Sequence, residues 1–171
     1  MNTTSNRHGS AVVTLPSDTT ILITRQFNAP ATDVFRAITT PELVKRWWGF
    51  DTSQWQVCDI DLRVGGSWRY VVTDGETEVG FHGVYRELDA PRRIVSTEAF
   101  EGLAAFGIHD DPDSVASVNT ITLEEVDGVT TMTTLVEHVN QEHRDGHIAS
   151  GMEGGMQVSY DRLEDLLLDT V

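Results

Sequence analysis

Apolar and polar residues alternate along most of this chain, with the period of two that predicts β-strands. The first such run is TILITRQF (20–27), which the breaker NAP ends. Between residues 55 and 137 further runs follow, separated by the turn sequences RVGG, TDGE, LDAP and VDGV. Links this short predict antiparallel hairpins between WQVCDIDL, GSWRYVV, EVGFHGVYREL, RRIVSTEAF, SVNTITLEEV and VTTMTTLVEHV.

Three stretches instead carry apolar residues at helical spacing. ATDVFRAI (31–38) predicts a short helix directly after the first strand. TPELVKRWWGF (40–50) predicts a second one, because Thr40 suits the N-cap and Pro41 suits the first helical position. After Glu142 the chain predicts one long helix of about five turns, from a stripe at spacings of three and four: Met152, Met156, Tyr160, Leu163 and Leu167.

This order of elements predicts an α+β fold in a single domain over residues 20–171. Residues 1–19 are expected to form a tail that is partly disordered. A meander of about seven strands curls, and the last helix must bury its apolar stripe against the concave face. The connection over residues 101–116 is longer than the others, and such loops serve as lids, interface arms or disordered segments.

Composition narrows the classes of partner. The 171 residues include 12 basic and 27 acidic side chains, which gives a formal net charge of −15. Binding to nucleic acid or anionic lipid rests on clustered Lys and Arg, so we expect neither nucleic acid nor a membrane as partner. We find no apolar run of ~18 residues and no secretion signal, so the cytoplasm is the default location. Cys58 is the single cysteine, which excludes an internal disulfide.

Four segments resemble the activator-of-Hsp-ninety-ATPase-like branch of the START/SRPBCC superfamily. They are ITRQFNAPATDVFRAITTPELVKRWWGF, GGSWRYVV, FHGVYRELDAPRRIVSTEAF and SGMEGGMQVSYDRLEDLLL, and the match runs from about Thr20 to Leu168. The resemblance implies the helix-grip fold, a curved antiparallel sheet wrapped around the C-terminal helix with a hydrophobic pocket between them. Members are generally free of metals, and branches with a lone domain often form dimers. We therefore expect no cofactor, and a homodimer is a further expectation.

Strand alternation predicts which residues face the inside of such a sheet. Trp68 and Tyr70 share one face, and Phe81 and Tyr85 share a face with Gly83, which leaves space between them. The final strand, VTTMTTLVEHV, leaves both phases open. A mostly apolar surface with a few convergent polar groups is typical of ligand pockets. The candidate ligand-binding residues are Trp47, Trp48, Trp68, Tyr70, Phe81, Tyr85, Glu98, Phe100, Asn119, Met152, Met156 and Tyr160.

The glycines at the start of the last helix and the two adjacent tryptophans each allow two structural interpretations. Gly151, Gly154 and Gly155 each cost about 1 kcal/mol relative to Ala inside a helix. Either they let the sheet or a ligand approach the helix closely, or the regular helix starts only after Gly155. Trp47 and Trp48 are adjacent and cannot share one helix face. One of them should anchor the short helix on the sheet, and the other should cap the cavity mouth.

An ionisable group inside such a pocket would be desolvated and suited to acid–base chemistry. The candidates are Glu98, His82 and His138. No metal site is expected, because His138, His143 and His147 lack the HExxH order and have no cysteine nearby.

We therefore interpret the chain as a domain that binds a small hydrophobic or amphipathic molecule in an internal pocket. One alternative is an enzyme of the cyclase, dehydratase or hydrolase kind, with Glu98, His82 or His138 as acid or base. Another is a co-chaperone-like interaction module, in which the 101–116 loop docks a partner through Leu103 and Phe106. The namesake of the family acts within a larger multi-domain protein, which disfavours that role for one domain.

Overall fold

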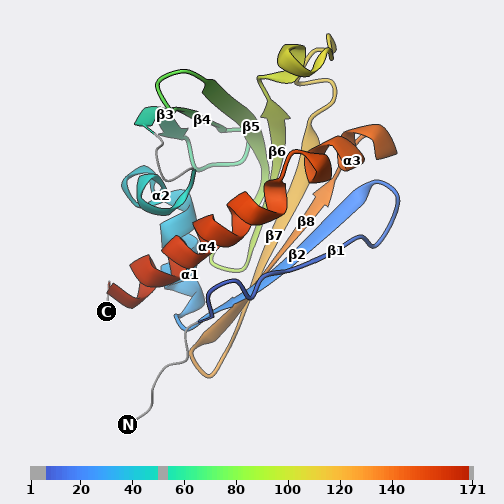
Figure 1. Ribbon diagram of the computed structural model, residues 1–171. Helices are drawn as coiled ribbons and strands as arrows, with labels where there is room; N and C mark the ends of the chain where they lie inside the picture. Colours follow the sequence, from blue (N-terminus) through green and yellow to red (C-terminus); the bar gives the residue numbers. More distant parts are fainter. Residues whose placement is uncertain (1–6, 50–53, 170–171) are drawn as a thin grey trace.

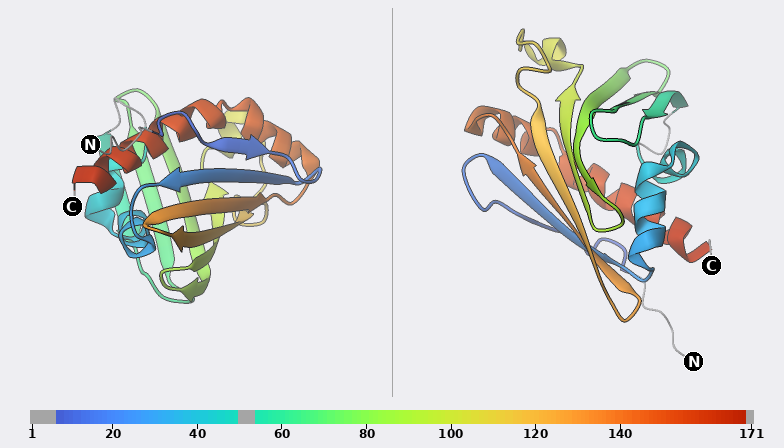
Figure 2. Two further views of the ribbon diagram at one scale, coloured as in Figure 1. Left: turned by 90° about the horizontal axis from the view of Figure 1, so that it is seen from below. Right: turned by 180° about the vertical axis from the view of Figure 1, so that it is seen from behind.

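One antiparallel sheet curves around the long helix α4, and the short helices α1 and α2 lie at one end of the sheet (Figures 1 and 2). The computed structural model describes residues 7–49 and 54–169. In that part of the chain the sheet has eight strands, in the order β1-β2-β8-β7-β6-β5-β4-β3. They are β1 (Val12–Thr14), β2 (Thr20–Phe27), β3 (Gln54–Ile60), β4 (Ser67–Thr73), β5 (Glu78–Asp89), β6 (Arg93–Phe100), β7 (Ser117–Val126) and β8 (Val129–Glu137).

The helices complete the predicted α+β class and the helix-grip arrangement, and both predictions are confirmed. They are α1 (Ala31–Thr39), α2 (Pro41–Trp47), the short 3-10 helix η1 (Leu103–Phe106), α3 (Gln141–Ala149) and α4 (Met152–Asp169). Pro41 opens α2 as predicted, with Thr40 at the N-cap, although the Thr40 side chain makes no capping hydrogen bond. The fixed φ of proline therefore contributes more to this helix start than the threonine hydroxyl does.

Two elements differ from the sequence prediction. The single helix expected after Glu142 is divided into α3 and α4, because Gly151 between them adopts a φ of +81°. That left-handed conformation suits glycine and ends a helix. The second difference is one of degree. The tail, expected to be partly ordered at AVVTL, forms a strand there, β1, in which Val12 pairs with Thr24 of β2.

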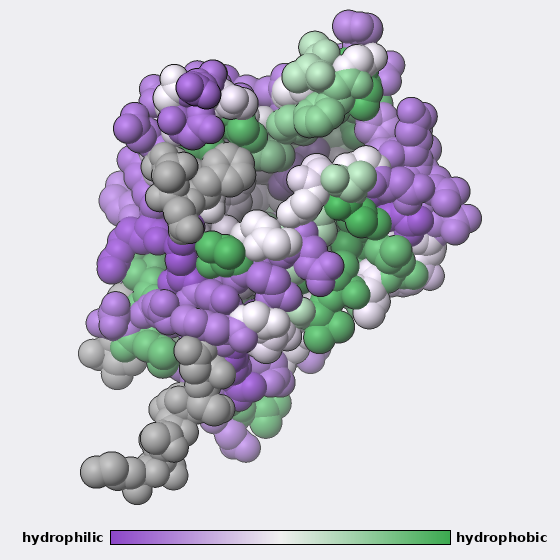
Figure 3. Space-filling view, in the orientation of Figure 1, coloured by the Kyte–Doolittle hydropathy of each residue, from purple (hydrophilic) through white to green (hydrophobic). Residues whose placement is uncertain are grey.

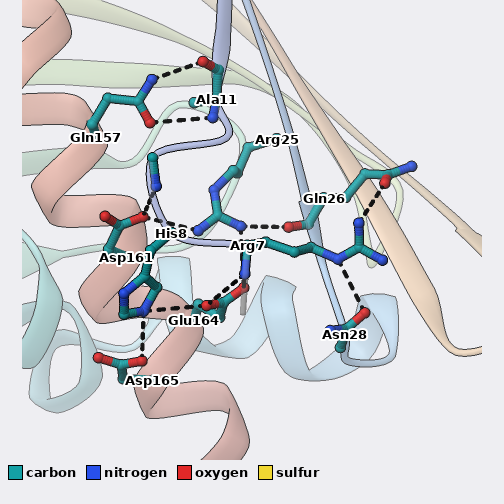
Figure 4. A network of polar contacts seen from close by, with 11 residues as sticks. Arg7, His8, Ala11, Arg25, Gln26, Asn28, Gln157, Asp161, Glu164 and Asp165 are labelled. Carbon is teal, nitrogen blue, oxygen red and sulfur yellow. Dashed lines mark hydrogen bonds and ion pairs between the residues drawn. The ribbon is translucent and has the colours of Figure 1, made fainter. Parts of the chain in front are cut away.

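The segment before β1 runs along α4 and ties the sheet edge to it (Figure 4). The backbone N–H groups of Arg7, Gly9 and Ala11 donate to side chains of α4 at 3.0, 2.9 and 3.1 Å. These side chains recur at intervals of three or four residues, so they share one face of the helix: Gln157, Asp161 and Glu164.

Beneath this segment the buried Arg25 of β2 pairs with Asp161 at 3.0 Å and with Glu164 at 3.4 Å (Figure 4). One edge of the sheet is thus closed against α4 by polar contacts as well as by packing.

The inward-facing residues of β2 and β8 form the main core together with α1, α2 and the C-terminal part of α4. All eight are buried: Ile21, Ile23, Arg25, Phe27, Thr130, Met132, Thr134 and Val136. The sequence left undecided which residues of the final strand face inward. The structure shows that they are those in phase with Met132 and Val136. Leu163 of α4 packs in this core with no exposed surface. We call this part of the sheet the filled half of the inner face.

Candidate functional site

The pairing register brings the predicted inward residues of the other strands onto the same concave face. Tyr70 pairs with Phe81, Phe81 pairs with Phe100, and Glu98 pairs with Ser117. The inward side chains of the filled half are all buried, whereas many of these side chains are only half-buried. We call them, with Trp48 just after α2, the open half of the inner face: Trp48, Trp55, Tyr70, Phe81, Glu98, Phe100 and Asn119. The surface is hollowed between η1 and the middle of α4 (Figure 3).

The two adjacent tryptophans have different surroundings. Trp47 is buried in the main core, where its indole N–H donates to the Ala37 carbonyl at 2.9 Å. It thereby anchors α2 to α1 and α4. Trp48 is half-buried, and its ring centroid lies 5.3 Å from that of Tyr70 and 5.6 Å from that of Phe81. The tryptophan of this pair that faces the open half is therefore Trp48.

Aromatic rings continue across the open half from one strand to the next. Trp48 lies 5.5 Å from Trp55, and Phe81 lies 5.3 Å from Phe100, both measured between ring centroids. Phe100 in turn approaches Phe106 of η1 at 6.0 Å. Edge-to-face and tilted pairs at these distances are the arrangements that aromatic rings favour. The sheet thus presents a continuous aromatic surface from β3 to the 101–116 loop.

Trp68 is one predicted site residue that the structure removes from the open surface. Its buried indole lies across β5 at Gly83, where an added Cβ would meet the indole nitrogen at 2.6 Å. The indole N–H donates to the Thr97 carbonyl at 3.2 Å. The space expected at Gly83 is therefore occupied by Trp68. Tyr85, also predicted for the site, is buried in the same cluster.

Glu98 is the carboxyl group of the open half. It is surrounded by protein yet keeps some accessible surface, and burial raises its pKa to about 7 despite a hydrogen bond from Asn119. The Asn119 amide donates to it at 3.3 Å, while the amide oxygen accepts from the Ser117 hydroxyl at 3.1 Å. A carboxyl group with this pKa exchanges its proton near neutral pH, as a general acid or base requires.

Two tyrosines lie close enough to Glu98 to be affected by its charge. Burial raises the pKa of both Tyr70 and Tyr160, and the Glu98 carboxylate adds a smaller contribution in the same direction. Tyr70 belongs to β4 and Tyr160 to α4. The polar groups of the open half therefore come from both the sheet and the helix.

The α4 residues predicted for the site lie mostly over the filled half. Met152 and Met156 pack with Tyr160 against Ile21 and its neighbours in β2 and β8. Tyr160 also contacts the rings of Phe27 and Trp47, with centroids 6.1 and 6.3 Å away. Of these three residues, Tyr160 is the one linked to both halves.

The structure tests both of the alternatives given for the α4 glycines. The helix begins at Met152, so the expectation that it starts only after Gly155 is wrong. Gly154 and Gly155 are exposed, and a Cβ at either would meet nothing within 4 Å. Close packing of the sheet is therefore not their role.

Of the candidate histidines, the structure places His82 on the opposite face of the sheet from Glu98. His82 lies on the outer face of β5, where its ring nitrogens approach Glu101 at 2.7 Å and Asp113 at 2.6 Å. Burial lowers the pKa of His82, but these two hydrogen bonds outweigh it and the net pKa is raised.

His138 follows β8 and hydrogen-bonds His147 of α3 at 3.0 Å. Burial, followed by the neighbouring His147, lowers the pKa of His138 to about 4, and burial also lowers that of His147. Both imidazoles are therefore neutral at pH 7.

Sequence reasoning missed a groove on the outer face. Its volume is about 810 Å³, and it lies between β4–β7 and the end of the 101–116 loop. Alternation places Arg69, His82 and Thr97 outward, but nothing in the sequence predicts that Asp113 folds back to His82. Cys58, on β3, has its pKa raised to about 11 by burial, so its thiol stays protonated at neutral pH.

Three solved bacterial structures share this fold. A crystal structure from Rhodobacter sphaeroides has a TM-score of 0.80 and 24% identity, covering 93% of this chain and 98% of that one. One from Mycobacterium smegmatis has a TM-score of 0.78 and 25% identity, covering 92% and 96%. A solution NMR structure from Staphylococcus epidermidis has a TM-score of 0.76 and 28% identity, covering 94% and 95%.

A family model described as Activator of Hsp90 ATPase homolog 1-like protein matches residues 28–168. The resemblance identified from the sequence motifs is thereby confirmed. No curated protein matches the chain. Within the residues that the structure describes, no helix is both long and apolar enough to cross a membrane.

Proposed function

Because this chain belongs to the family of Activator of Hsp90 ATPase homolog 1-like proteins, we propose that it binds a small hydrophobic or amphipathic molecule between the sheet and α4. The observation that carries this proposal is the contrast within one inner face. Every inward residue of β2 and β8 is buried, whereas a group of large aromatic side chains on the opposite strands is not. Apolar surface of this kind, grouped around a few polar atoms, is what ligand pockets provide.

The open half supplies enough apolar surface for measurable affinity. A ligand that buries about 300 Å² of apolar surface, and covers the same area of protein, gains about 15 kcal/mol in gross terms. Lost translational, rotational and side-chain freedom offsets roughly half of that gain. We therefore expect dissociation constants in the micromolar range, at about −8 kcal/mol.

Native mass spectrometry of the purified protein, followed by titration on tryptophan fluorescence, tests this function. We expect either a co-purified mass or saturable quenching by a hydrophobic molecule, because Trp48 and Trp55 lie in the open half. Phe81→Ala should weaken the response, whereas Val126→Ala, at a residue that is 70% exposed on the β7–β8 turn, should not. An empty protein without a response to lipids, flavonoids and polyketide-like aromatics would contradict the proposal.

Glu98 favours a second candidate function, acid–base catalysis on the bound molecule. A carboxyl group whose pKa is about 7 can give and take a proton near neutral pH. Once a bound molecule is identified, its turnover should show a pH dependence centred near that pKa. Glu98→Gln should abolish the turnover while binding persists, and an unchanged rate in this variant would remove the catalytic candidate.

A further inference from the structure

We propose that the molecule held in the open half carries a cationic amine or quaternary ammonium head, bound between the Glu98 carboxylate and the neighbouring aromatic rings. This inference rests on the function proposed above and adds the chemical class of its ligand. It follows from the charges that face the interior, from the position of Glu98 beside the rings, and from the charge of the whole chain.

The Glu98 carboxylate has no cationic partner among the described residues. Its one hydrogen bond comes from the neutral Asn119 amide at 3.3 Å. The buried cation of the inner face is Arg25, which already pairs with Asp161 and Glu164. A buried carboxylate without a counter-charge is costly, and a cation that enters with the ligand would relieve that cost.

The nearest strands provide no counter-charge either. Arg25 lies on β2, and β8 and β7 separate that strand from β6. At about 4.8 Å for each step between strands, the backbones of β2 and β6 are on the order of 14 Å apart. His138 and His147 have lowered pKa values and are neutral at pH 7. Among the residues that the structure describes, the Glu98 carboxylate is therefore not balanced by a cationic side chain.

Aromatic rings share the face of the sheet on which Glu98 lies. Phe100 is two residues from Glu98 on the same face of β6, which puts their Cα atoms about 6.6 Å apart. Phe81 lies beside Phe100 at 5.3 Å, and Trp48 lies beside Phe81 at 5.6 Å. Tryptophan, tyrosine and phenylalanine faces attract ammonium groups, most strongly where water is excluded. One head group can thus contact a carboxylate and several rings together.

The same arrangement disfavours anionic amphiphiles such as fatty acids. A ligand carboxylate placed near Glu98 would repel it, and the net charge of −15 disfavours the approach of any anion. A neutral hydroxyl head could accept a hydrogen bond from a protonated Glu98 or donate one to its carboxylate, but it would gain nothing from the charge. These three heads therefore rank in the order cation, neutral, anion.

A matched probe series measures this ranking by isothermal titration calorimetry at about pH 8. The probes are 4-phenylbutyl-trimethylammonium, 4-phenylbutan-1-ol and 5-phenylpentanoate, which share an apolar body and differ in the head. We expect the ammonium probe to bind roughly tenfold more tightly than the alcohol. The carboxylate probe should bind more weakly than either.

Glu98→Gln supplies the decisive variant. It should lower the affinity for the ammonium probe about tenfold and change that for the alcohol less than about threefold. Glu124→Gln is the matched control, because it removes the same charge at an exposed residue of β7 and should alter neither affinity. Thermal unfolding of both variants shows that they are folded.

The pH dependence gives an independent readout. Tyr70 and Tyr160 face Glu98 from β4 and α4, and their raised pKa values keep them neutral over this range. Binding of the permanently charged probe should therefore rise roughly fivefold between about pH 6 and about pH 8, as Glu98 loses its proton. Glu98→Gln should remove this rise.

The outcomes separate this inference from the function on which it rests. If the alcohol or the carboxylate binds as tightly as the ammonium probe, or Glu98→Gln leaves the ammonium affinity unchanged, the ligand class is wrong while the binding function stands. If no probe binds, both proposals are overturned.

Discussion

The filled half and the open half of the inner face belong to one sheet but serve different purposes. In the filled half, α4 packs directly on β2, and Leu163 and Phe27 have no exposed surface. In the open half, Tyr70, Phe81 and Phe100 point to the same side of the sheet and remain half-buried. Both halves are apolar, so composition alone does not explain the difference. It arises because α4 runs beside β2 and α2, and no helix of the described residues packs to the same extent on β6, which carries Glu98, or on the neighbouring β5.

This contrast separates stability from binding. Burial of apolar surface is the main favourable term in folding, so substitutions in the filled half should reduce stability. Substitutions in the open half should instead change what the protein binds.

Leu163→Ala in the filled half should lower the free energy of unfolding by about 3 kcal/mol, the cost of deleting a fully buried leucine and leaving a cavity. Leu168→Ala is the control, since Leu168 lies near the end of the same helix and is 42% exposed. Urea unfolding measures both variants. A loss below about 1 kcal/mol for Leu163→Ala would show that this half is not tightly packed.

Glu98 should make the protein less stable as the pH rises. Its folded pKa of about 7 lies above the ordinary value of 4.5, so the native state holds the proton more tightly than the unfolded chain. The contribution of Glu98 to stability is then greatest below about pH 4.5 and decreases between about pH 4.5 and about pH 7. Above about pH 7 it is constant. The total decrease should be about 2 kcal/mol, because the group is only half-buried. Glu98→Gln should flatten this part of the curve in denaturant titrations at a series of pH values. An unchanged curve would argue that the carboxyl is well solvated.

Phe81→Ala in the open half should cost only about 1 kcal/mol of stability, because this side chain is half-buried and its removal leaves no enclosed cavity. Val84→Ala, at a residue that is 42% exposed on the outer face of β5, is the control for a loss of apolar surface on the same strand. Ligand affinity should fall for Phe81→Ala alone. A core-like loss of 3 kcal/mol or more, without any effect on binding, would assign Phe81 to the packed core.

His82 should give the smallest effect, on the outer face and away from both halves. Its contacts with Glu101 and Asp113 raise its pKa, so they stabilise the 101–116 loop below about pH 6.5 and are lost as the pH rises through the raised value. The contribution should stay below about 1 kcal/mol. The protection of the loop amides, measured relative to the base-catalysed intrinsic exchange rate at each pH, should fall at high pH, and His82→Asn should remove this fall. His109→Asn, at an exposed residue of the same loop, should leave it in place.

The sequence predicted the sheet well because each strand keeps its period of two between clear turn signals. The bounds of β2 and β7 agree with the predicted 20–27 and 117–126. It was less informative where the signal is not periodic. The break before α4 depends on the φ of Gly151, and β1 is stabilised by pairing with β2 and by its approach to α4.

The candidate site was predictable to a similar extent. Alternation placed Glu98, Phe81 and Asn119 on one face, as the register shows. It could not show that Trp68 fills the space at Gly83, because that contact depends on a side-chain rotamer. It also could not assign Trp47 and Trp48, since adjacent residues of one type differ only in where the helix lies on the sheet.

The indole N–H signals of the tryptophans test the central claim most directly. In a ¹⁵N NMR titration with 4-phenylbutan-1-ol, the indole N–H signals of Trp48 and Trp55 report on the open half. The indole N–H of Trp47 donates a hydrogen bond to the Ala37 carbonyl and reports on the core. Trp→Phe variants assign each signal. We predict saturable shifts for Trp48 and Trp55 and little change for Trp47. Unmoved signals, or a shift confined to Trp47, would contradict the assignment of binding to the open half.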